Sequence, residues 1–210
     1  MAEMSMNKAI HGAFRRDLDR FVAALAAFPA GDKKRAEQLG LAWDNFDDQL
    51  MHHHTSEHAI AWPALEAMGV SRGLITEMDA EHDTMATALG TTRSAMSALR
   101  ASASAEDAVA AHSAMLELRR VTVVHLDHEE DEIESVYLAN EGTDEMKAMG
   151  RKFSKVSPAR GGRFFAWVLD GATPAETAAV TGTIPGPVLL IINGIFGASY
   201  RRTVAPTWRS

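Results

Sequence analysis

Histidine and glutamate recur in this chain at a spacing that suits metal binding. Glu57 follows His53 after four residues, and Glu129 follows His125 at the same spacing. Residues four apart lie on one face of an α-helix, so each pair can direct an imidazole and a carboxylate at one point. Nitrogen and oxygen ligands of this kind bind iron, manganese or zinc. The spacing therefore indicates a metal site that at least two helices share.

Four helices are predicted to position these pairs. Apolar residues recur every three or four positions along the first two thirds of the chain, which is typical of helices that pack around a core. Ser104 is placed to begin one helix as an N-cap, and Gly69 is placed to end another. The predicted helices cover residues 4–28, 32–68, 71–100 and 104–138. Because the loops between them are short, we expect an all-α, up-down-up-down four-helix bundle.

The apolar stripe of each predicted helix contains one histidine: His11, His53, His82 and His125. Glu57 and Glu129 follow on two of these stripes one turn later, which gives six candidate metal ligands. Adjacent helical residues point about 100° apart, so the other histidines fall outside the stripes or outside the shared level. These are His52, His54, His58, His112 and His128. We expect His52, His54 and His58 to be solvated or to lie beside the ligands without binding metal.

Two alternatives to a site for two metal ions can be weighed on energetic grounds. A polar core layer without metal would bury two carboxylates and four imidazoles, and buried charges are costly without partners. A single zinc ion would use three or four of these groups and leave the others buried and unpaired. Cysteine is absent, which excludes disulfides and thiolate metal sites. Six ligands on four helices therefore favour two metal ions.

The order of these residues resembles the hemerythrin-like (HHE cation-binding) domain family. The resemblance rests on His11, His53 with Glu57, His82, and His125 with Glu129, and it covers residues 1–140. The stretch "HHTSEHAIAWP" also has the family's proline six residues after the glutamate, whereas the fourth helix has Ser135 at that place. The resemblance implies a non-haem site for two iron ions with an oxo or hydroxo bridge, in which Glu57 and Glu129 bridge the metals.

Departures from the family's oxygen carriers bear on function. Those carriers are expected to have His-x-x-x-His on the third helix, but here Ala86 follows His82 at that spacing, and Glu129 replaces an aspartate. Two six-coordinate irons offer about twelve positions. Four imidazoles, four carboxylate oxygens and one shared oxo group would leave roughly two of these open, with room beside Ala86. The only tyrosines that could fill one are Tyr137 and Tyr200, and Tyr137 lies about 12 Å along the helix from Glu129.

Open positions favour the turnover of small oxidants, with hydrogen peroxide first and nitric oxide or dioxygen next. Such a protein would be a non-haem diiron oxidoreductase. The alternative is a non-catalytic protein that binds or senses dioxygen or iron. Fold alone does not decide between these functions.

Charge divides the chain into an acidic body and a basic extension. The net charge is −7, and residues 146–210 carry nine basic against two acidic side chains, so the extension is +7 and residues 1–145 are −14. We expect residues 1–145 to form the bundle and residues 146–210 to form a helical C-terminal extension. The acidic balance argues against nucleic acid as a partner. The first residues lack the apolar core of a signal peptide, which favours the cytoplasm.

The extension combines a strong helix start with an uncharged apolar run. Thr173 is placed as an N-cap, with Pro174 in the first turn and Glu176 reaching back. The apolar core at residues 188–198 is about half the length needed to span a bilayer. We expect the extension to cap the bundle or to form a homodimer interface. The alternative is contact with a membrane surface, helped by the neighbouring arginines.

Overall fold

The computed structural model describes residues 4–184 and 186–209, and these residues form helices without any β-strand. The all-α prediction is confirmed. Four long helical segments account for the first two thirds of the chain. They are α1 (Met6–Ala26), α2 (Lys33–Ser56) with its continuation through η1 (Glu57–Ala61) and α3 (Trp62–Ala67), α4 (Arg72–Ser102), and α5 (Ala105–Ala139).

Polar side chains fix where these helices begin. Ser71 and Ser104 accept hydrogen bonds from backbone N–H groups three residues ahead, and Asp32 does the same for α2. Such caps satisfy N–H groups that have no partner inside the helix. Gly69 has a φ of +98°, in the left-handed region that favours glycine, so the chain can turn sharply between α3 and α4. The N-cap predicted at Ser104 is confirmed.

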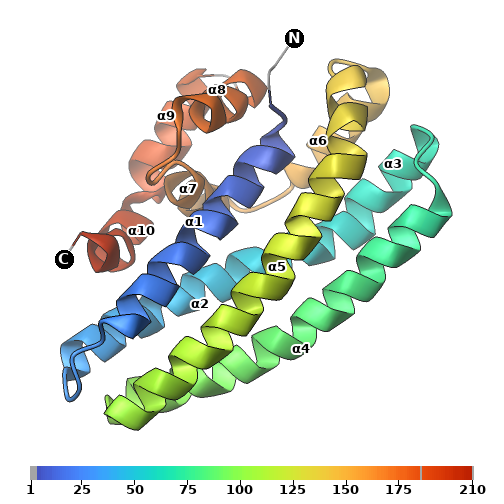
Figure 1. The fold of residues 1–210 in the computed structure, drawn as a ribbon. Coiled ribbons are helices and arrows are strands. Elements are labelled where there is room, and N and C mark those ends of the chain that lie inside the picture. The colour runs from blue at the N-terminus through green and yellow to red at the C-terminus, as the bar shows by residue number, and fades with distance from the viewer. Residues whose placement is uncertain (1–3, 185, 210) are drawn as a thin grey trace.

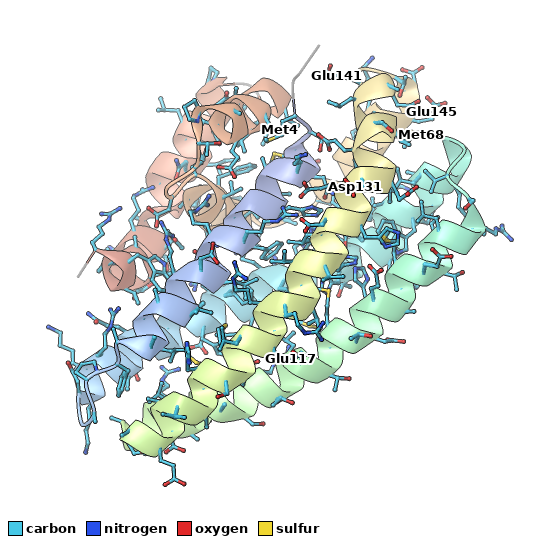
Figure 2. The ribbon with its side chains drawn as sticks, in the orientation of Figure 1. Met4, Met68, Glu117, Asp131, Glu141 and Glu145 are labelled. Carbon is cyan, nitrogen blue, oxygen red and sulfur yellow. The ribbon has the colours of Figure 1, made fainter. Side chains whose placement is uncertain are left out.

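The four segments lie side by side along most of their length. Figure 1 shows α5 running beside both α1 and α4, while α2 crosses behind them from the α1–α2 turn towards α3. The closest packing joins α4 to α5 and α1 to α5, followed by α2 to α4. Side chains fill the space that the ribbons enclose (Figure 2). This arrangement brings the middle of all four segments together.

A π-helical turn interrupts the second segment just where its predicted carboxylate lies. The backbone N–H of Trp62 donates to the carbonyl of Glu57, five residues back instead of four. Pro63 follows, and proline has no N–H and a ring that clashes with the carbonyl four residues earlier in a regular helix. The extra residue in this turn rotates the buried face. Ala61 and Leu65 are therefore buried, whereas the sequence pattern places Ile60 and Ala64 on the core stripe.

The buried apolar residues form two clusters. The larger one fills the end of the bundle where α1 meets α2 and includes Phe14, Phe21 and Phe46. The smaller one lies at the other end, around Trp62, Leu65 and other residues of α3, α4, α5 and α6 (Asp144–Phe153). Figure 2 labels Met68 and Glu145 at that end, where α6 packs across α3. The polar residues predicted to bind metal separate the two clusters.

The C-terminal extension packs against the bundle. After α6 it contains α7 (Pro158–Val168), α8 (Pro174–Thr183), α9 (Gly186–Ile191), η2 (Ile192–Phe196), α10 (Ala198–Thr203) and η3 (Ala205–Trp208). The orange and red elements lie beside α1, on the side away from α4 (Figure 1). Trp167 lies 4.9 Å from Phe14 between ring centroids, and its indole N–H donates to buried Asp17 at 2.8 Å. Thr173 and Glu176 form the predicted reciprocal cap of α8. The extension and the bundle thus share one core.

No single helix in the described part of the chain is long and apolar enough to cross a membrane. Residues Pro174–Thr183 and Gly186–Phe196 meet the length and composition criteria only as a pair, and the pair bends by 110°.

Candidate metal centre

The six residues selected from the sequence come together in the middle of the bundle. Their ligand atoms form two groups, and within each group these atoms lie within 4.8 Å of one another. The first group, here called cluster A, is His11, His53, Glu57 and Glu129; the second, cluster B, is His54, Glu57, His82 and His125. Glu57 belongs to both. Two adjacent groups that share a carboxylate are arranged as a site for two metal ions would be.

His54 corrects the sequence-based assignment. Helical spacing places it on the flank of its helix and predicts no contact with metal, but its ring stacks on that of His82 with centroids 4.1 Å apart. It also lies 5.9 Å from the ring of His125. α2 therefore contributes two adjacent histidines, with His53 directed at cluster A and His54 at cluster B. The site has five imidazoles instead of four.

Ala86 does not share the burial of the clustered residues, because it is exposed on α4. α4 contributes His82 alone, one turn before the buried Met85.

Several polar atoms in the clusters are close to one another without being hydrogen bonded. His53 Nε2 lies 2.9 Å from Glu57 Oε1, and His82 Nε2 lies 3.4 Å from Glu57 Oε2. His53 Nε2, His54 Nε2, both Glu57 oxygens and Glu129 Oε2 are nevertheless buried without a hydrogen-bond partner. Buried polar groups rarely remain unsatisfied, and each one costs about 1–3 kcal/mol. Convergent unpaired donor atoms fit metal ions, because a cation would satisfy all of them at once.

Carboxylates outside the clusters hold two of the histidine rings. His11 Nδ1 lies 3.0 Å from Glu130 Oε1, and Glu130 is also bound by Arg15. His125 Nδ1 lies 2.8 Å from Glu81 Oε2. Such partners orient a ligating ring so that its other nitrogen faces the metal, and they increase its basicity. Sequence reasoning missed Glu81 and Glu130, although each adjoins a predicted ligand.

Burial leaves most of the clustered histidines uncharged. It lowers the pKa of His53 and of His82 to about 3, and it also lowers the pKa of His54 and of His125. Metal ions bind the neutral form of imidazole. These four rings are therefore in the ligating form at neutral pH.

His11 and the two carboxylates have different protonation states. Burial lowers the pKa of His11, but the charge of the Glu129 carboxylate, 3.2 Å away, outweighs it and raises that pKa to about 9. Burial acts to raise the pKa of Glu129, but His11 lowers it to about 2. Burial and the nearby Glu129 raise the pKa of Glu57 well above its ordinary value. Without metal, His11 and Glu57 thus hold protons that a cation would displace.

The remaining histidines and the tyrosines lie outside both clusters. The side chain of His58 is 74% exposed, and His52 lines a surface pocket with Arg160. Tyr200 donates to Asp170 at 3.0 Å within the extension, so it is no candidate ligand. Tyr137 is buried, and burial together with the charge of Glu129 raises its pKa.

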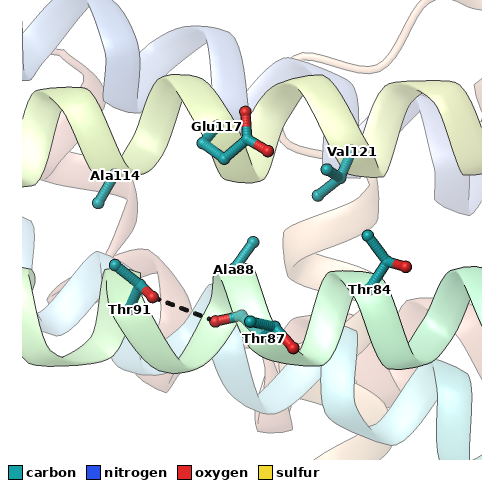
Figure 3. A pocket seen from close by; sticks show the side chains of 7 residues that line it. All are labelled: Thr84, Thr87, Ala88, Thr91, Ala114, Glu117 and Val121. Carbon is teal, nitrogen blue, oxygen red and sulfur yellow. Dashed lines mark hydrogen bonds between the residues drawn. The ribbon is translucent and has the colours of Figure 1, made fainter.

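A groove of about 350 Å³ lies on the surface between α4 and α5. Figure 3 shows its lining: Thr84, Thr87, Ala88, Thr91, Ala114, Glu117 and Val121. None of these residues belongs to a cluster, and the one ionisable side chain among them, Glu117, pairs with Arg120 at 2.6 Å. The groove therefore has no evident chemistry of its own.

Comparison with protein families agrees with this geometry. The family model of the hemerythrin HHE cation binding domain matches residues 5–137, which include all seven residues of the two clusters. The chain belongs to the hemerythrin HHE family. Searches of characterised proteins and of solved structures found no match. As a hemerythrin HHE domain, the bundle is a cation-binding domain, and clusters A and B are the groups that can hold the metal.

Proposed function

We propose that the protein is a non-haem diiron protein on an up-down-up-down four-helix bundle, and that it binds a small oxidant, dioxygen first. The observation that supports this most directly is His54 in cluster B. It raises the number of imidazoles to five, divided as two in cluster A and three in cluster B. The nitrogen and oxygen donor set, without sulfur, suits iron.

The number of donor atoms from the protein decides how many coordination positions would remain for an external small molecule. Two six-coordinate metals have about twelve positions. Five imidazoles, up to four carboxylate oxygens and a shared oxide or hydroxide counted twice fill roughly eleven of them. If both carboxylates served both metals, one position would remain, and it would fall in cluster A, which has only His11 and His53 as nitrogen donors. A single position supports binding of one small molecule better than the two-position arrangement expected from the sequence.

The protein's own residues would prepare this site for metal. His11 has an exposed fraction of 0% and Glu129 likewise, so cluster A is closed to bulk water. Glu130 and Glu81 hold the rings of His11 and His125. When bound, two iron ions would supply the electrons that a small oxidant accepts. The buried apolar residues around the layer would restrict access to molecules as small as dioxygen, peroxide or nitric oxide.

Peroxide turnover is the second candidate, and one observation favours it. Glu81 also accepts a hydrogen bond from His128, with its Oε1 2.7 Å from His128 Nδ1, and the side chain of His128 is 32% exposed. His125, Glu81 and His128 thus form a hydrogen-bonded path from cluster B towards solvent. In the disproportionation of hydrogen peroxide, one molecule takes up two protons and two electrons to give two water molecules. A second molecule gives up the same number of protons and electrons and leaves as dioxygen. A path of this kind could carry the protons.

Reconstitution with ferrous iron under argon tests both functions. We expect two iron ions per chain, a visible absorption band after admission of dioxygen, and loss of that band when argon removes the gas. Peroxide turnover would appear as oxygen release in proportion to bound iron. Slower release in Glu81→Gln with full iron content would favour the proton path. Iron content well below two per chain, or an unchanged spectrum with all three oxidants, would refute the proposal.

A further inference from the structure

The last part of the extension exposes large apolar side chains to solvent. In α9 and η2, Leu190 is 76% exposed, Ile195 is 65% exposed and Ile191 is 56% exposed. The segment Gly186–Phe196 contains no charged residue. Isolated apolar side chains on a surface are ordinary, but several on one short segment mark a contact surface.

Tight packing against α7 holds this segment in place. A Cβ atom added at Gly162 would lie 2.6 Å from the backbone carbon of Phe196 and 2.7 Å from the carbonyl oxygen of Ile192. The two backbones therefore touch at this glycine, which leaves Leu190, Ile191 and Ile195 on solvent-exposed sides. Figure 1 shows α9 on the outside of the molecule, away from α4 and α5. The apolar side chains are presented by a fixed element and not by a loose tail.

A basic segment adjoins these apolar side chains. Arg151, Lys152 and Lys155 are exposed at the end of α6 and after it, and none of them makes an ion pair within the described residues. Phe153 and Val156, which are 38% and 37% exposed, lie between and beside them. Val156 and Ile192 each have a Cγ2 atom 3.8 Å from a Cβ built on Gly161, so the basic segment meets η2 there. The two parts form one surface, here called the basic–apolar face: Arg151–Val156 with Val188–Phe196.

Charge distinguishes the possible occupants of this face. Exposed arginines of the bundle, such as Arg93 and Arg119, pair with carboxylates at 2.7 Å and 2.6 Å. Arg151, Lys152 and Lys155 of the basic–apolar face pair with no carboxylate among the described residues, although Arg160 nearby pairs with Asp48. Residues 146–210 carry a net charge of +7. A second copy of the same face would bring positive charge against positive charge. An anionic lipid surface offers both negative headgroups and an apolar layer at the depth that short side chains reach.

We propose that the basic–apolar face docks the protein on the surface of an anionic lipid bilayer. Leu190, Ile191 and Ile195 enter the boundary between headgroups and acyl chains, and Arg151, Lys152 and Lys155 contact the headgroups. The apolar run is too short to cross the bilayer, so binding is peripheral and reversible. This inference does not depend on the metal or on its chemistry.

Co-sedimentation of the full chain with vesicles tests the proposal. We expect binding to vesicles that contain phosphatidylglycerol and little binding to vesicles of phosphatidylcholine alone. Each lysine at an anionic surface is worth about fivefold in affinity, so Lys152→Glu with Lys155→Glu should weaken binding by about 25-fold or more. The matched control reverses Lys33 and Lys34, which are exposed at the start of α2 and change the net charge equally. That control should bind nearly as well as the unmodified protein.

A second pair of variants tests the apolar part. Leu190→Ser with Ile195→Ser should reduce vesicle binding at least tenfold, whereas Val109→Ser, on an equally exposed residue of α5, should not. Helix content by circular dichroism and the midpoint of thermal unfolding confirm that each variant is folded. Equal binding to both kinds of vesicle, or equal weakening by the Lys33 and Lys34 control, would overturn the proposal. So would a dimer in solution that the Leu190 and Ile195 changes dissociate, together with no binding to lipid.

Discussion

Replacement of His54 by alanine is the most direct test of the site as the structure describes it. The ring of His54 is stacked on His82 and its Nε2 is buried without a hydrogen-bond partner. The substitution removes one of three imidazoles from cluster B and leaves cluster A with both of its own. We therefore expect selective loss of one metal ion, so that the variant binds about one iron per chain where the proposed function predicts two for the unmodified protein.

The size of the effect can be bounded. Loss of a side chain that only supports a metal ligand typically weakens binding about 10–100-fold. His54 is placed to bind directly, so its removal should weaken binding at cluster B by about 100-fold or more. Cluster A should change little, because His11 and His53 remain. Glu57 is shared by both clusters, so some weakening at cluster A is expected through its altered position.

The assay is a titration with ferrous iron under argon in competition with a chelator, followed by metal analysis. Two control variants are available within the same run of histidines. His52→Ala changes a residue beside Arg160 and Asp48 in a surface pocket, and His58→Ala changes an exposed ring. Both should retain two iron ions. His82→Ala should behave like His54→Ala.

One result would refute this reasoning. If His54→Ala retained two iron ions with unchanged affinity while His82→Ala lost one, His54 would only support the site. The single open position would then become two, and the preference for dioxygen binding over peroxide turnover would lose its basis.

Three further predictions concern protonation, packing and α4. Four buried histidines have pKa values below 6.5: His53, His54, His82 and His125. Their contribution to the free energy of unfolding is present above pH 6.5 and is lost as the pH falls towards 3. The loss is about 1.4 kcal/mol for each proton and each pH unit. The raised pKa of Glu57 opposes the loss from one of these protons, because the folded protein already holds a proton on that carboxyl. Urea unfolding of metal-free protein should show this decline, and constant stability from pH 7 to 5 would contradict it. Gly162→Ala should destabilise by about 1–3 kcal/mol in thermal unfolding, because backbone atoms of η2 must move, while Gly150→Ala, with open space around it, should not. Ala86→His should leave iron content and the optical spectrum unchanged, because position 86 is exposed; an altered spectrum would show that it reaches the metal.

Much of the site was predictable because helical spacing is regular. A histidine on each apolar stripe, with a glutamate one turn later on two of them, selected six residues that the structure brings together. The caps at Ser104 and Thr173 were predictable for a similar reason, since they depend on neighbouring residues alone. Regular spacing also identified the family that the comparison with family models shows.

His54 could not be predicted from a single helical stripe, because it lies beside that stripe. The two clusters together are wider than one stripe, and a residue turned about 100° from His53 still reaches cluster B because it faces the next helix. The π-helical turn caused the other error, because one extra residue before Pro63 moved the buried face to Ala61 and Leu65. Glu81 lies in an acidic stretch, and nothing in a single sequence indicates which of several carboxylates turns inward.

The division of the apolar core has a consequence for how the molecule unfolds. The larger apolar cluster contains Phe14, Phe21 and Phe46, and the smaller apolar cluster contains Trp62 and Leu65. The histidines and glutamates of clusters A and B lie between the two apolar clusters. Cooperativity arises where each part of a core stabilises the next, and an unsatisfied polar layer transmits little of that support. The smaller cluster should therefore open as a separate unit in metal-free protein, with faster amide hydrogen exchange in α3 and α6 than in α1. Metal binding would join the two apolar clusters into a single folding unit, so the metal would determine the cooperativity of unfolding as well as the chemistry of the site.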